Sequence, residues 1–517
     1  MKRLNRQFLL DYKPSIPVML PKTHFFELPI KVLQFGEGRF IRAFLNYFIE
    51  IANHKQLFNG RTVVIQPRKA DKASIINEQD GLFTLCACGL QDGVEKQEFI
   101  IISSIHKAIA AKTQWKETLE LAEIPSLEII ASNTTEAGLI YDPDDSIEKN
   151  PPDSFPGKLT ALLYHRYKHF DGDLNRGLVI LPLELVENNG DVLKELVLKL
   201  VKKWNLEENF MKWLNRANAF YKSIVDRIVT GYPNKKELEK YQQQLGYEDK
   251  LFNVAELYHS WIIEADEKLQ SIIPFDKAGL NVQFVDNIAT YFLRKVRILN
   301  GAHTSMVPIA YLAGKNFVKE SIEDPLINIY IQNILENEVI PFINLPKNEL
   351  IQYKDTILER FRNPFIQHRL LSISLYSTSK MRLRVVPSIL SYYKKFNEPP
   401  PLLSFAFAAF LVFMHIREKE ALNWFGYRDS EKYQYHDDSN SLEFFYNAWN
   451  SINPSKKDDI HKLVESICQN ETLWGSNLSK IPRFVPLIAN HITQILKVGM
   501  HSALRQVLIS NNLLERI

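Results

Sequence analysis

The pattern of hydrophobic residues changes near residue 285, and this change constrains the fold more than any other feature. Before it, short β-like runs alternate with helical segments, and the last clear run covers residues 281–285. Beyond Lys295, helical periodicities dominate and strand alternation is scarce, so that the polar stretch 423–440 is expected to be a surface loop. This order predicts an α/β domain over residues 1–285, followed by a mostly α-helical domain over residues 286–517.

A strand followed at once by a glycine turn opens the α/β part. Residues 31–35 form a strand-like run, and an amphipathic helical pattern extends from the turn to about residue 51. Two glycines let the backbone turn tightly and approach a pyrophosphate at the helix N-terminus, as in a dinucleotide-binding βαβ unit. The third glycine of that motif is replaced by Ile41, and for this element in isolation an ordinary strand–helix turn is the stronger interpretation. The dinucleotide interpretation predicts a Rossmann-like domain with cofactor contacts at Phe35, Gly36, Glu37, Gly38, Arg39 and Phe40.

The end of the second strand bears on the choice of nicotinamide cofactor. Residues 61–66 form this strand, and no Asp or Glu stands at its tip. An acidic residue at this place commonly holds the ribose hydroxyls of NAD, whereas Arg68 and Lys69 suit a 2′-phosphate. These residues therefore leave NAD and NADP both open, with Arg68 as a candidate cofactor contact.

A polar loop, Ser-Asn-Thr-Thr-Glu-Ala-Gly at residues 132–138, follows the β-like run 127–131. Ligands of open α/β sheets bind at the carboxyl ends of strands, which favours a cofactor-binding loop. Ser, Asn and Thr are also preferred at helix N-caps, and a capped helix start is an equal alternative. The candidate cofactor contacts in the loop are Asn133, Thr134, Thr135 and Glu136.

Two further places carry charge beside apolar strands. Glu184 directly follows the buried run 178–183, where catalytic groups often lie, although it could equally cap the helix expected from residue 191. Asp226 and Arg227 stand between β-branched residues, and charge in an apolar setting requires pairing. The local sequence leaves structural and site roles open for all three side chains.

The segment 295–303 combines a lysine, an amide and an imidazole in a largely apolar helical region. On an ideal α-helix, Lys295 and His303 lie about 80° apart and Asn300 about 60° from His303, so that all three can face one cavity. Desolvation lowers the pKa of a lysine, and such a lysine can act as a general base near neutral pH. A snorkelling lysine beside a satisfied core histidine is the alternative, and spacing alone favours it.

Cations gather at residues 361–364 and 377–384 of the helical part. If these helices cover the carboxyl edge of the sheet, Lys380 or a neighbouring arginine can meet an anionic substrate. Taken alone, each of these cations is more typical of an exposed surface.

Charge and cysteine content exclude several functional classes. A net charge of +3 over 517 residues gives no case for binding nucleic acid or an acidic membrane surface. The three cysteines are too few for a disulfide framework and are expected to be buried in a reducing compartment. The apolar stretch 402–416 is too short to span a bilayer, and residues 1–14 show no signal peptide. No Cys/His cluster in the sequence has the spacing of zinc ligands. We therefore expect a cytoplasmic protein without a metal, a membrane partner or a nucleic-acid partner.

Taken together, these segments resemble the mannitol dehydrogenase family of polyol-specific long-chain dehydrogenases. The similar stretches are residues 34–38, 132–138, 225–233, 295–304 and 361–364. In that family the lysine is the general base, the asparagine helps to form the oxyanion-binding site, and the histidine binds substrate oxygens. The resemblance therefore implies catalytic roles for Lys295, Asn300 and His303.

The resemblance also implies a reaction, a cofactor and a substrate class. It is greatest to the members that act on hexuronates, which implies NAD-dependent hydride transfer to a small sugar acid by a monomeric enzyme. We assign Lys380 to the substrate carboxylate and place Asp226, Arg227 and Glu184 around the substrate. By alignment, Leu185 occupies the position of a second oxyanion-binding asparagine of mannitol dehydrogenases, which leaves Asn300 as the one such asparagine. Another polyol or sugar-acid dehydrogenase is the alternative within this class, and a nucleotide-sensing protein without chemistry is the alternative outside it.

Overall fold

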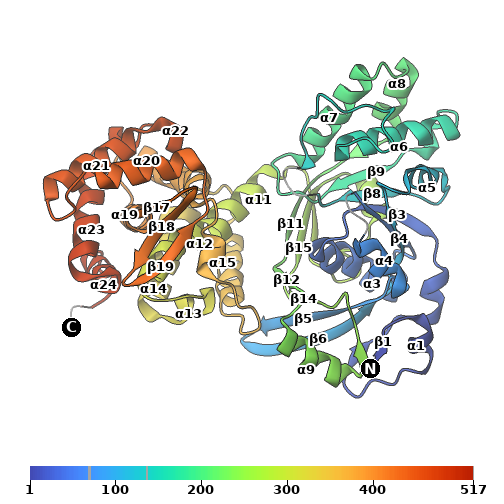
Figure 1. Ribbon diagram of the computed structural model, residues 1–517, viewed down its shortest axis with the longest axis horizontal. Helices are drawn as coiled ribbons and strands as arrows, with labels where there is room; N and C mark the ends of the chain where they lie inside the picture. Colours follow the sequence, from blue (N-terminus) through green and yellow to red (C-terminus); the bar gives the residue numbers. More distant parts are fainter. Residues whose placement is uncertain (68–70, 135–137, 516–517) are drawn as a thin grey trace. The chain divides into compact units, whose positions relative to one another are not determined.

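The computed structural model describes residues 1–67, 71–134 and 138–515 (Figure 1). The chain divides into two compact units, Met1–Ile288 and Ala289–Ile517. The first unit contains a parallel sheet covered by helices, and the second is mostly helical. The predicted fold class is thereby confirmed.

A parallel sheet with the strand order β10-β9-β8-β3-β4-β7 forms the centre of the first unit. β3 (Ile30–Phe35) pairs with β4 (Arg61–Gln66) on one side and with β8 (Ile129–Ser132) on the other. The chain order therefore reverses between β3 and β8, and ligands of doubly wound sheets bind at the carboxyl ends of the strands at such a switch point. The outer strands are β7 (Ile105–Ala110), β9 (Val179–Pro182) and β10 (Ala219–Phe220).

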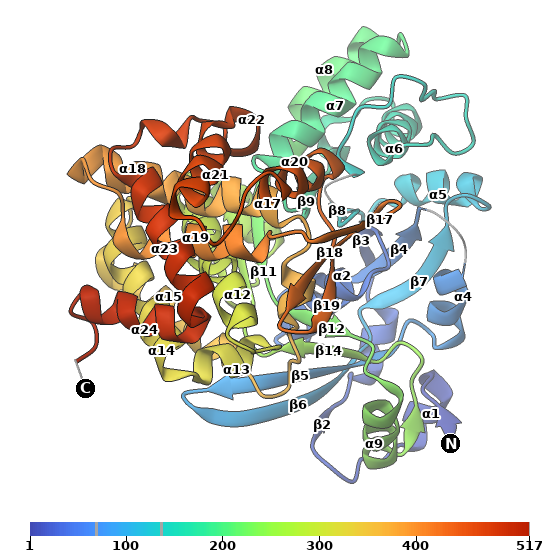
Figure 2. The same cartoon turned by 60° about the vertical axis from the view of Figure 1, so that its left-hand side comes forward.

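Apolar side chains on both faces of the strands explain why this sheet is central. In β3, Val32 packs into one hydrophobic core while Leu33 and Phe35 pack into another. Continuous apolar runs of this kind are typical of parallel strands that are covered on both sides. The core that contains Leu33 includes side chains of α5 (Trp115–Glu120), α6 (Phe155–His169), α7 (Asn189–Lys203) and α8 (Glu208–Ala217). The core that contains Val32 includes side chains of η2 (Arg42–Asn46), α3 (Tyr47–His54) and α4 (Asp71–Glu78) (Figures 1 and 2).

Smaller sheets and helices complete the first unit. One sheet has the order β12 (Val229–Gly231), β14 (Asn253–Glu256), β5 (Phe83–Gln91), β6 (Val94–Ile102) and β2 (Val18–Met19). Another has the order β11 (Lys222–Asp226), β15 (Ser260–Glu264) and β16 (Val282–Val285), and β1 (Lys2–Arg3) pairs with β13 (Tyr247–Glu248). The remaining α-helices are α1 (Arg6–Asp11), α2 (Arg39–Ile41), α9 (Lys235–Leu245) and α10 (Glu267–Ile272), and the 3-10 helices are η1 (Thr23–Glu27), η3 (Leu121–Glu123) and η5 (Leu174–Arg176).

Strongly apolar helices form the centre of the second unit. α12 (Gly301–Leu312) contacts α19 (Pro401–Phe413), which also contacts α23 (Phe484–Val498) (Figure 1). In α19 every residue after Pro401 is buried. A helix that is hydrophobic all round belongs in the interior of a helical domain, because it has no polar face for water.

A distant carboxylate caps the start of α19. Proline occupies its first positions, and in the described part of the chain its N-cap residue makes no side-chain capping hydrogen bond. The carboxylate of Glu338 accepts the N–H of Leu402 at 2.8 Å and the N–H of Leu403 at 2.7 Å. Burial raises the pKa of Glu338 to about 7. The start of this central helix therefore depends on one buried side chain from η7 (Ile334–Val339).

The other elements of the second unit surround these helices. They are α11 (Ala289–Arg294), η6 (Lys295–Asn300), α13 (Val318–Glu323), α14 (Pro325–Asn333), η8 (Ile340–Phe342), α15 (Lys347–Phe361), α16 (Leu370–Ile373), α17 (Ser377–Lys380), η9 (Met381–Val385), α18 (Val386–Phe396), α20 (Ser439–Asn450), α21 (Lys457–Gln469), α22 (Glu471–Trp474) and α24 (Met500–Ser510). The 3-10 helix η10 (Leu478–Lys480) also belongs to this unit. The turns η6, η7 and η9 are π-helical and lie within longer helices.

One segment of the second unit differs from the prediction. The stretch 423–440, expected as a surface loop, contains β18 (Asn423–Arg428) and β19 (Glu431–Tyr435), which form a meander with β17 (Glu418–Glu420). In β19 the buried Tyr433 and Tyr435 alternate with exposed polar residues. The loop prediction was wrong because polar composition was given more weight than this period-two pattern of aromatic residues.

Candidate active site and cofactor site

The residues that follow the carboxyl ends of β3 and β8 contact each other at the switch point. Gly36 has a φ angle of +117°, and a Cβ atom there would lie 3.0 Å from the carbonyl oxygen of Asn133. The N–H of Asn133 donates to the carbonyl oxygen of Phe35 at 3.0 Å. Position 36 therefore requires glycine, both for its backbone conformation and for the close approach of the neighbouring loop.

The helix that follows this loop presents an N-terminus that no described side chain caps. α2 continues directly into η2 and α3, and Gly38 is its N-cap residue. A Cβ atom at Gly38 would meet no described atom within 4 Å, so that the space beside it is open. Uncapped N–H groups and the positive end of a helix dipole suit a phosphate group. These features fit the pyrophosphate of a dinucleotide.

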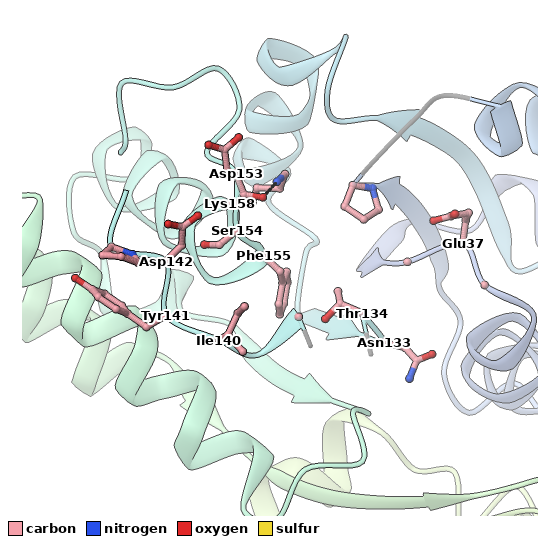
Figure 3. Close-up of a pocket in the computed structure, with 15 residues that line it drawn as sticks. Glu37, Asn133, Thr134, Ile140, Tyr141, Asp142, Asp153, Ser154, Phe155 and Lys158 are labelled. Atoms are coloured by element: carbon pink, nitrogen blue, oxygen red, sulfur yellow. Dashed lines mark hydrogen bonds between the residues drawn. The ribbon is translucent and has the colours of Figure 1, made fainter. Parts of the chain in front are cut away.

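A cavity of about 630 Å³ opens beside the glycine loop (Figure 3). Five residues expected at the cofactor line it, namely Gly36, Glu37, Gly38, Asn133 and Thr134. Apolar surfaces suited to a nucleobase come from Ile140, Tyr141 and Phe155, which the sequence analysis missed. Figure 3 shows Glu37 on the side of the cavity opposite Tyr141 and Asp142. The missed residues follow the loop 132–138, and no local pattern shows that the chain returns to the cavity there.

The other expected cofactor contacts lie behind the loop or beyond the described residues. Phe35 is fully buried and packs against Phe155 with ring centroids 5.1 Å apart. Arg39 donates through Nη1 to the carbonyl oxygen of Thr230 at 2.8 Å, and Phe40 stacks on Phe44. Arg68, Thr135 and Glu136 lie outside the part of the chain that the structure describes.

Glu184 is buried under the loop that follows β8. Its Oε1 accepts the N–H of Thr134 at 2.8 Å and the hydroxyl of Thr134 at 3.0 Å, and its Oε2 accepts the hydroxyl of Ser132 at 3.0 Å. Burial raises the pKa of Glu184, and these hydrogen bonds oppose that shift. The alternative of a helix cap does not apply, since Asn188 is the N-cap residue of α7.

Arg227 is buried within the first unit. Its guanidinium donates to the carbonyl oxygens of Ala43 at 2.6 Å and Glu256 at 3.0 Å, and it lies 4.4 Å from the centre of the Tyr47 ring. These contacts support the helix that follows the glycine loop. Asp226 ends β11 and is also buried. The expected places of Asp226 and Arg227 in the substrate site stay predictions.

Lys295 and Asn300 lie at the two ends of the π-helical turn η6. The N–H of Gly301 bonds to the carbonyl oxygen of Val296, five residues earlier. On an ideal α-helix residues five apart are separated by about 140°, whereas a π-helix with i→i+5 bonds brings them onto one face. The π-helical turn therefore places the expected general base and the expected oxyanion-binding amide on the same side of the helix.

His303 lies in the first turn of α12 and is 7% exposed. Its ring packs on Phe361 at 4.2 Å and lies edge-on to His368 at 5.3 Å, measured between ring centroids. Its Nε2 atom has no hydrogen-bond partner among the described residues. The pKa of His303 is well below its usual value because of burial, and the nearby His368, Arg360, Arg384 and Lys380 lower it further. His303 is therefore a neutral imidazole with an unsatisfied nitrogen among cations.

Lys380 belongs to the same group of side chains. Its Nζ donates to the carbonyl oxygen of Ile373 at 2.7 Å, and burial together with Arg384 lowers its pKa to about 8. Lys380 lowers the pKa values of both His303 and His368. The structure thus brings the expected Lys380 and His303 together and adds His368, which the sequence analysis missed. Nothing in the local sequence marks His368, because its place depends on the packing of the segment after α15.

Among the described residues, no group of three or more His, Cys, Asp or Glu side chains could hold a metal ion. Within the same ranges, no helix is both long and apolar enough to cross a membrane.

Comparison with known proteins identifies the family. The mannitol dehydrogenase Rossmann domain matches residues 30–276, and the mannitol dehydrogenase C-terminal domain matches residues 287–496. Altronate oxidoreductase of Bacillus subtilis (strain 168) is 39% identical over 486 residues, which cover 94% of this chain and 97% of that protein. Altronate oxidoreductase of Yersinia enterocolitica (serotype O:8 / biotype 1B) is 38% identical over 478 residues, which cover 92% and 96%.

Solved structures share the fold at lower identity. Mannitol 2-dehydrogenase of Pseudomonas fluorescens, in a ternary complex with NAD and D-mannitol, has a TM-score of 0.74 and 21% identity over 98% of this chain and 99% of that chain. A substrate-free D-sorbitol dehydrogenase has a TM-score of 0.76 and 20% identity over 97% and 100%. The chain belongs to the mannitol dehydrogenase family. It is an oxidoreductase that acts on CH–OH groups, and its first unit is a Rossmann domain.

Proposed function

We propose that this enzyme reversibly reduces D-tagaturonate to D-altronate with NADH. The sequence looks most like tagaturonate reductase, also called altronate oxidoreductase, and the curated relatives carry the second of these names. The structural observation that carries the proposal is the buried His303, whose unpartnered nitrogen lies among cations in the second unit.

The cations around His303 favour a sugar acid over a neutral polyol. An ammonium has three N–H donors, and the carbonyl oxygen of Ile373 takes one from Lys380. A substrate carboxylate can accept another, which is a charge-assisted hydrogen bond. Such a carboxylate also offsets the mutual repulsion of Lys380 and Arg384, which a hydroxyl group cannot do. We therefore assign Lys380 to the substrate carboxylate and His303 to a substrate hydroxyl or carbonyl oxygen.

Lys295 and Asn300 carry the proton transfer in this proposal. In the reducing direction, protonated Lys295 donates a proton to the developing alkoxide, and the Asn300 amide N–H stabilises the negative charge on that oxygen. In the oxidising direction, neutral Lys295 removes the proton of the substrate hydroxyl. NAD supplies or accepts the hydride when it is bound. The shared face of η6 supports these roles, because both groups must reach one oxygen atom.

The cavity of the first unit favours NAD over NADP. Its described lining carries carboxylates at Glu37, Asp142 and Asp153, which disfavour an additional phosphate on the ribose. Lys158 also lines the cavity, and its ammonium donates to the carbonyl oxygen of Asp153 at 2.7 Å. NAD is therefore the proposed cofactor, and NADP is tested beside it.

The first experiment is an assay of NADH consumption with tagaturonate, run beside fructuronate and fructose and repeated with NADPH. Rapid turnover of tagaturonate with NADH alone supports the proposal. Turnover only of fructuronate or fructose would assign the enzyme to fructuronate reduction or to another polyol oxidation. A folded protein that binds NADH and reduces none of these compounds would favour the remaining alternative, a nucleotide-sensing protein without chemistry.

A further inference from the structure

Glu184 is a buried carboxylate that the proposed proton and hydride transfers do not use. It follows β9 at the carboxyl edge of the central sheet and is 2% exposed. Its carboxylate accepts hydrogen bonds from the Ser132 hydroxyl and from the hydroxyl and backbone N–H of Thr134, in the loop after β8. An exposed substrate-binding carboxylate would not be enclosed in this way.

The loop that Glu184 holds forms a wall of the cofactor cavity. Asn133 and Thr134 line the cavity, and Asn133 also approaches Gly36 of the glycine loop. The side-chain amide of Asn133 donates to the carbonyl oxygen of Leu183 at 3.3 Å, which adds a second link to the chain after β9. A displacement of this loop would therefore alter the surface that receives the nucleotide.

Position 138 shows how closely the Thr134 side chain is placed. A Cβ atom on Gly138, which also lines the cavity, would lie 2.2 Å from the Thr134 hydroxyl oxygen. The same hydroxyl donates to Glu184 on its other side. Glu184 thus holds the Thr134 hydroxyl on one side, and Gly138 leaves room for it on the other.

We propose that Glu184 is a positioning residue for cofactor binding, whose carboxylate holds residues 132–134 in the shape that forms the cavity wall. The inference rests on the proposed use of a dinucleotide. It assigns Glu184 to the cofactor side of the reaction, in place of the substrate contact expected from the sequence.

The test compares NADH binding in wild-type protein, Glu184→Ala and Glu184→Gln by fluorescence titration. Alanine removes the acceptors of three hydrogen bonds, and the Kd for NADH should rise on the order of tenfold or more. Glutamine can accept both hydrogen bonds from Thr134 through its side-chain oxygen and donate one to Ser132 through its side-chain nitrogen. The Kd of the Glu184→Gln variant for NADH should therefore stay within about threefold of wild type. In steady state, the alanine variant should show a raised KM for NADH, with kcat at saturating NADH and KM for the sugar acid nearly unchanged.

Glu50→Ala is the matched control. Glu50 is a fully buried carboxylate of the same unit that accepts the N–H of Ser103 at 2.7 Å, and it lies outside the cofactor cavity lining. This variant should lose thermal stability with an unchanged Kd for NADH. Equal Kd values for wild type and Glu184→Ala, or a raised KM for the sugar acid alone, would overturn the inference. Wild-type protein that binds neither NADH nor NADPH would overturn the proposed function and this inference with it.

Discussion

Replacement of Lys380 by methionine tests the proposed recognition of the substrate carboxylate most directly. Methionine keeps most of the side-chain volume and removes the charge. A hydrogen bond between charged groups contributes about 1.5–3 kcal/mol, which corresponds to a loss of about 10- to 150-fold in kcat/KM for tagaturonate. The neutral ketose tagatose has a hydroxymethyl group in place of the carboxylate, so the same substitution should lower kcat/KM for tagatose only slightly. The quantity to measure is the ratio of kcat/KM for tagaturonate to that for tagatose.

The pH dependence of this ratio gives an independent check. The pKa of Lys380 is lowered to about 8, and only the protonated ammonium attracts the carboxylate. The ratio should therefore be highest below pH 8 and fall about tenfold per pH unit above it. The pKa of the free enzyme applies here, because the pH dependence of kcat/KM reports the ionisation of groups in the free enzyme. Proton transfer at Lys295 affects both substrates and cancels in the ratio. In Lys380→Arg the charge persists to much higher pH, so that the ratio should no longer fall.

Lys462→Met is the control, since Lys462 is an exposed lysine on α21 of the same unit. It should leave the ratio unchanged at every pH. The assignment of Lys380 would be refuted if Lys380→Met lowered kcat/KM equally for both ketoses. It would also be refuted if the fall above pH 8 persisted in Lys380→Arg.

Three further changes test other parts of the molecule. Lys295→Ala should abolish turnover while leaving the Kd for NADH nearly unchanged in a fluorescence titration; loss of both in folded protein would count against the general-base role. Glu338→Ala leaves two buried N–H groups of α19 without an acceptor, which should lower the free energy of unfolding by about 2–6 kcal/mol. Calorimetry should then show a Tm lowered by roughly 5–20 °C, and a shift below about 2 °C would contradict the capping role. Gly36→Ala combines a disfavoured φ angle with a contact to Asn133, so it should raise the Kd for NADH; an unchanged Kd would show that the glycine loop does not form the site.

Local motifs made part of the cavity lining predictable from the sequence. The glycine turn at residues 36–38 and Asn133 and Thr134 of the polar loop after β8 line the cavity. The partner of that loop was not predictable, because Glu184 reaches Thr134 only through the neighbouring positions of β8 and β9 in the sheet. A single sequence shows which residues end strands, but it does not show which strands are neighbours.

The substrate side was less predictable, because its geometry departs from regular structure and its parts come from separate segments. The expectation for Lys295 and Asn300 used an ideal α-helix, whereas η6 is π-helical. His368 lies against His303 although 64 residues of packed helices separate them in the chain. The confirmed fold class and enzyme class follow from patterns that extend over many residues, and these individual contacts do not.

The π-helical turn at η6 makes the spacing of the chain a functional property in its own right. The π-helical winding of residues 295–300 keeps Lys295 and Asn300 on one face. α-Helical winding at the present chain length would instead separate them by about 140° and turn Lys295 away from the oxygen atom that both groups are proposed to share. Deletion of one residue together with that change of winding would bring the two within about 40° of each other again, so that the winding and the length of this turn are coupled.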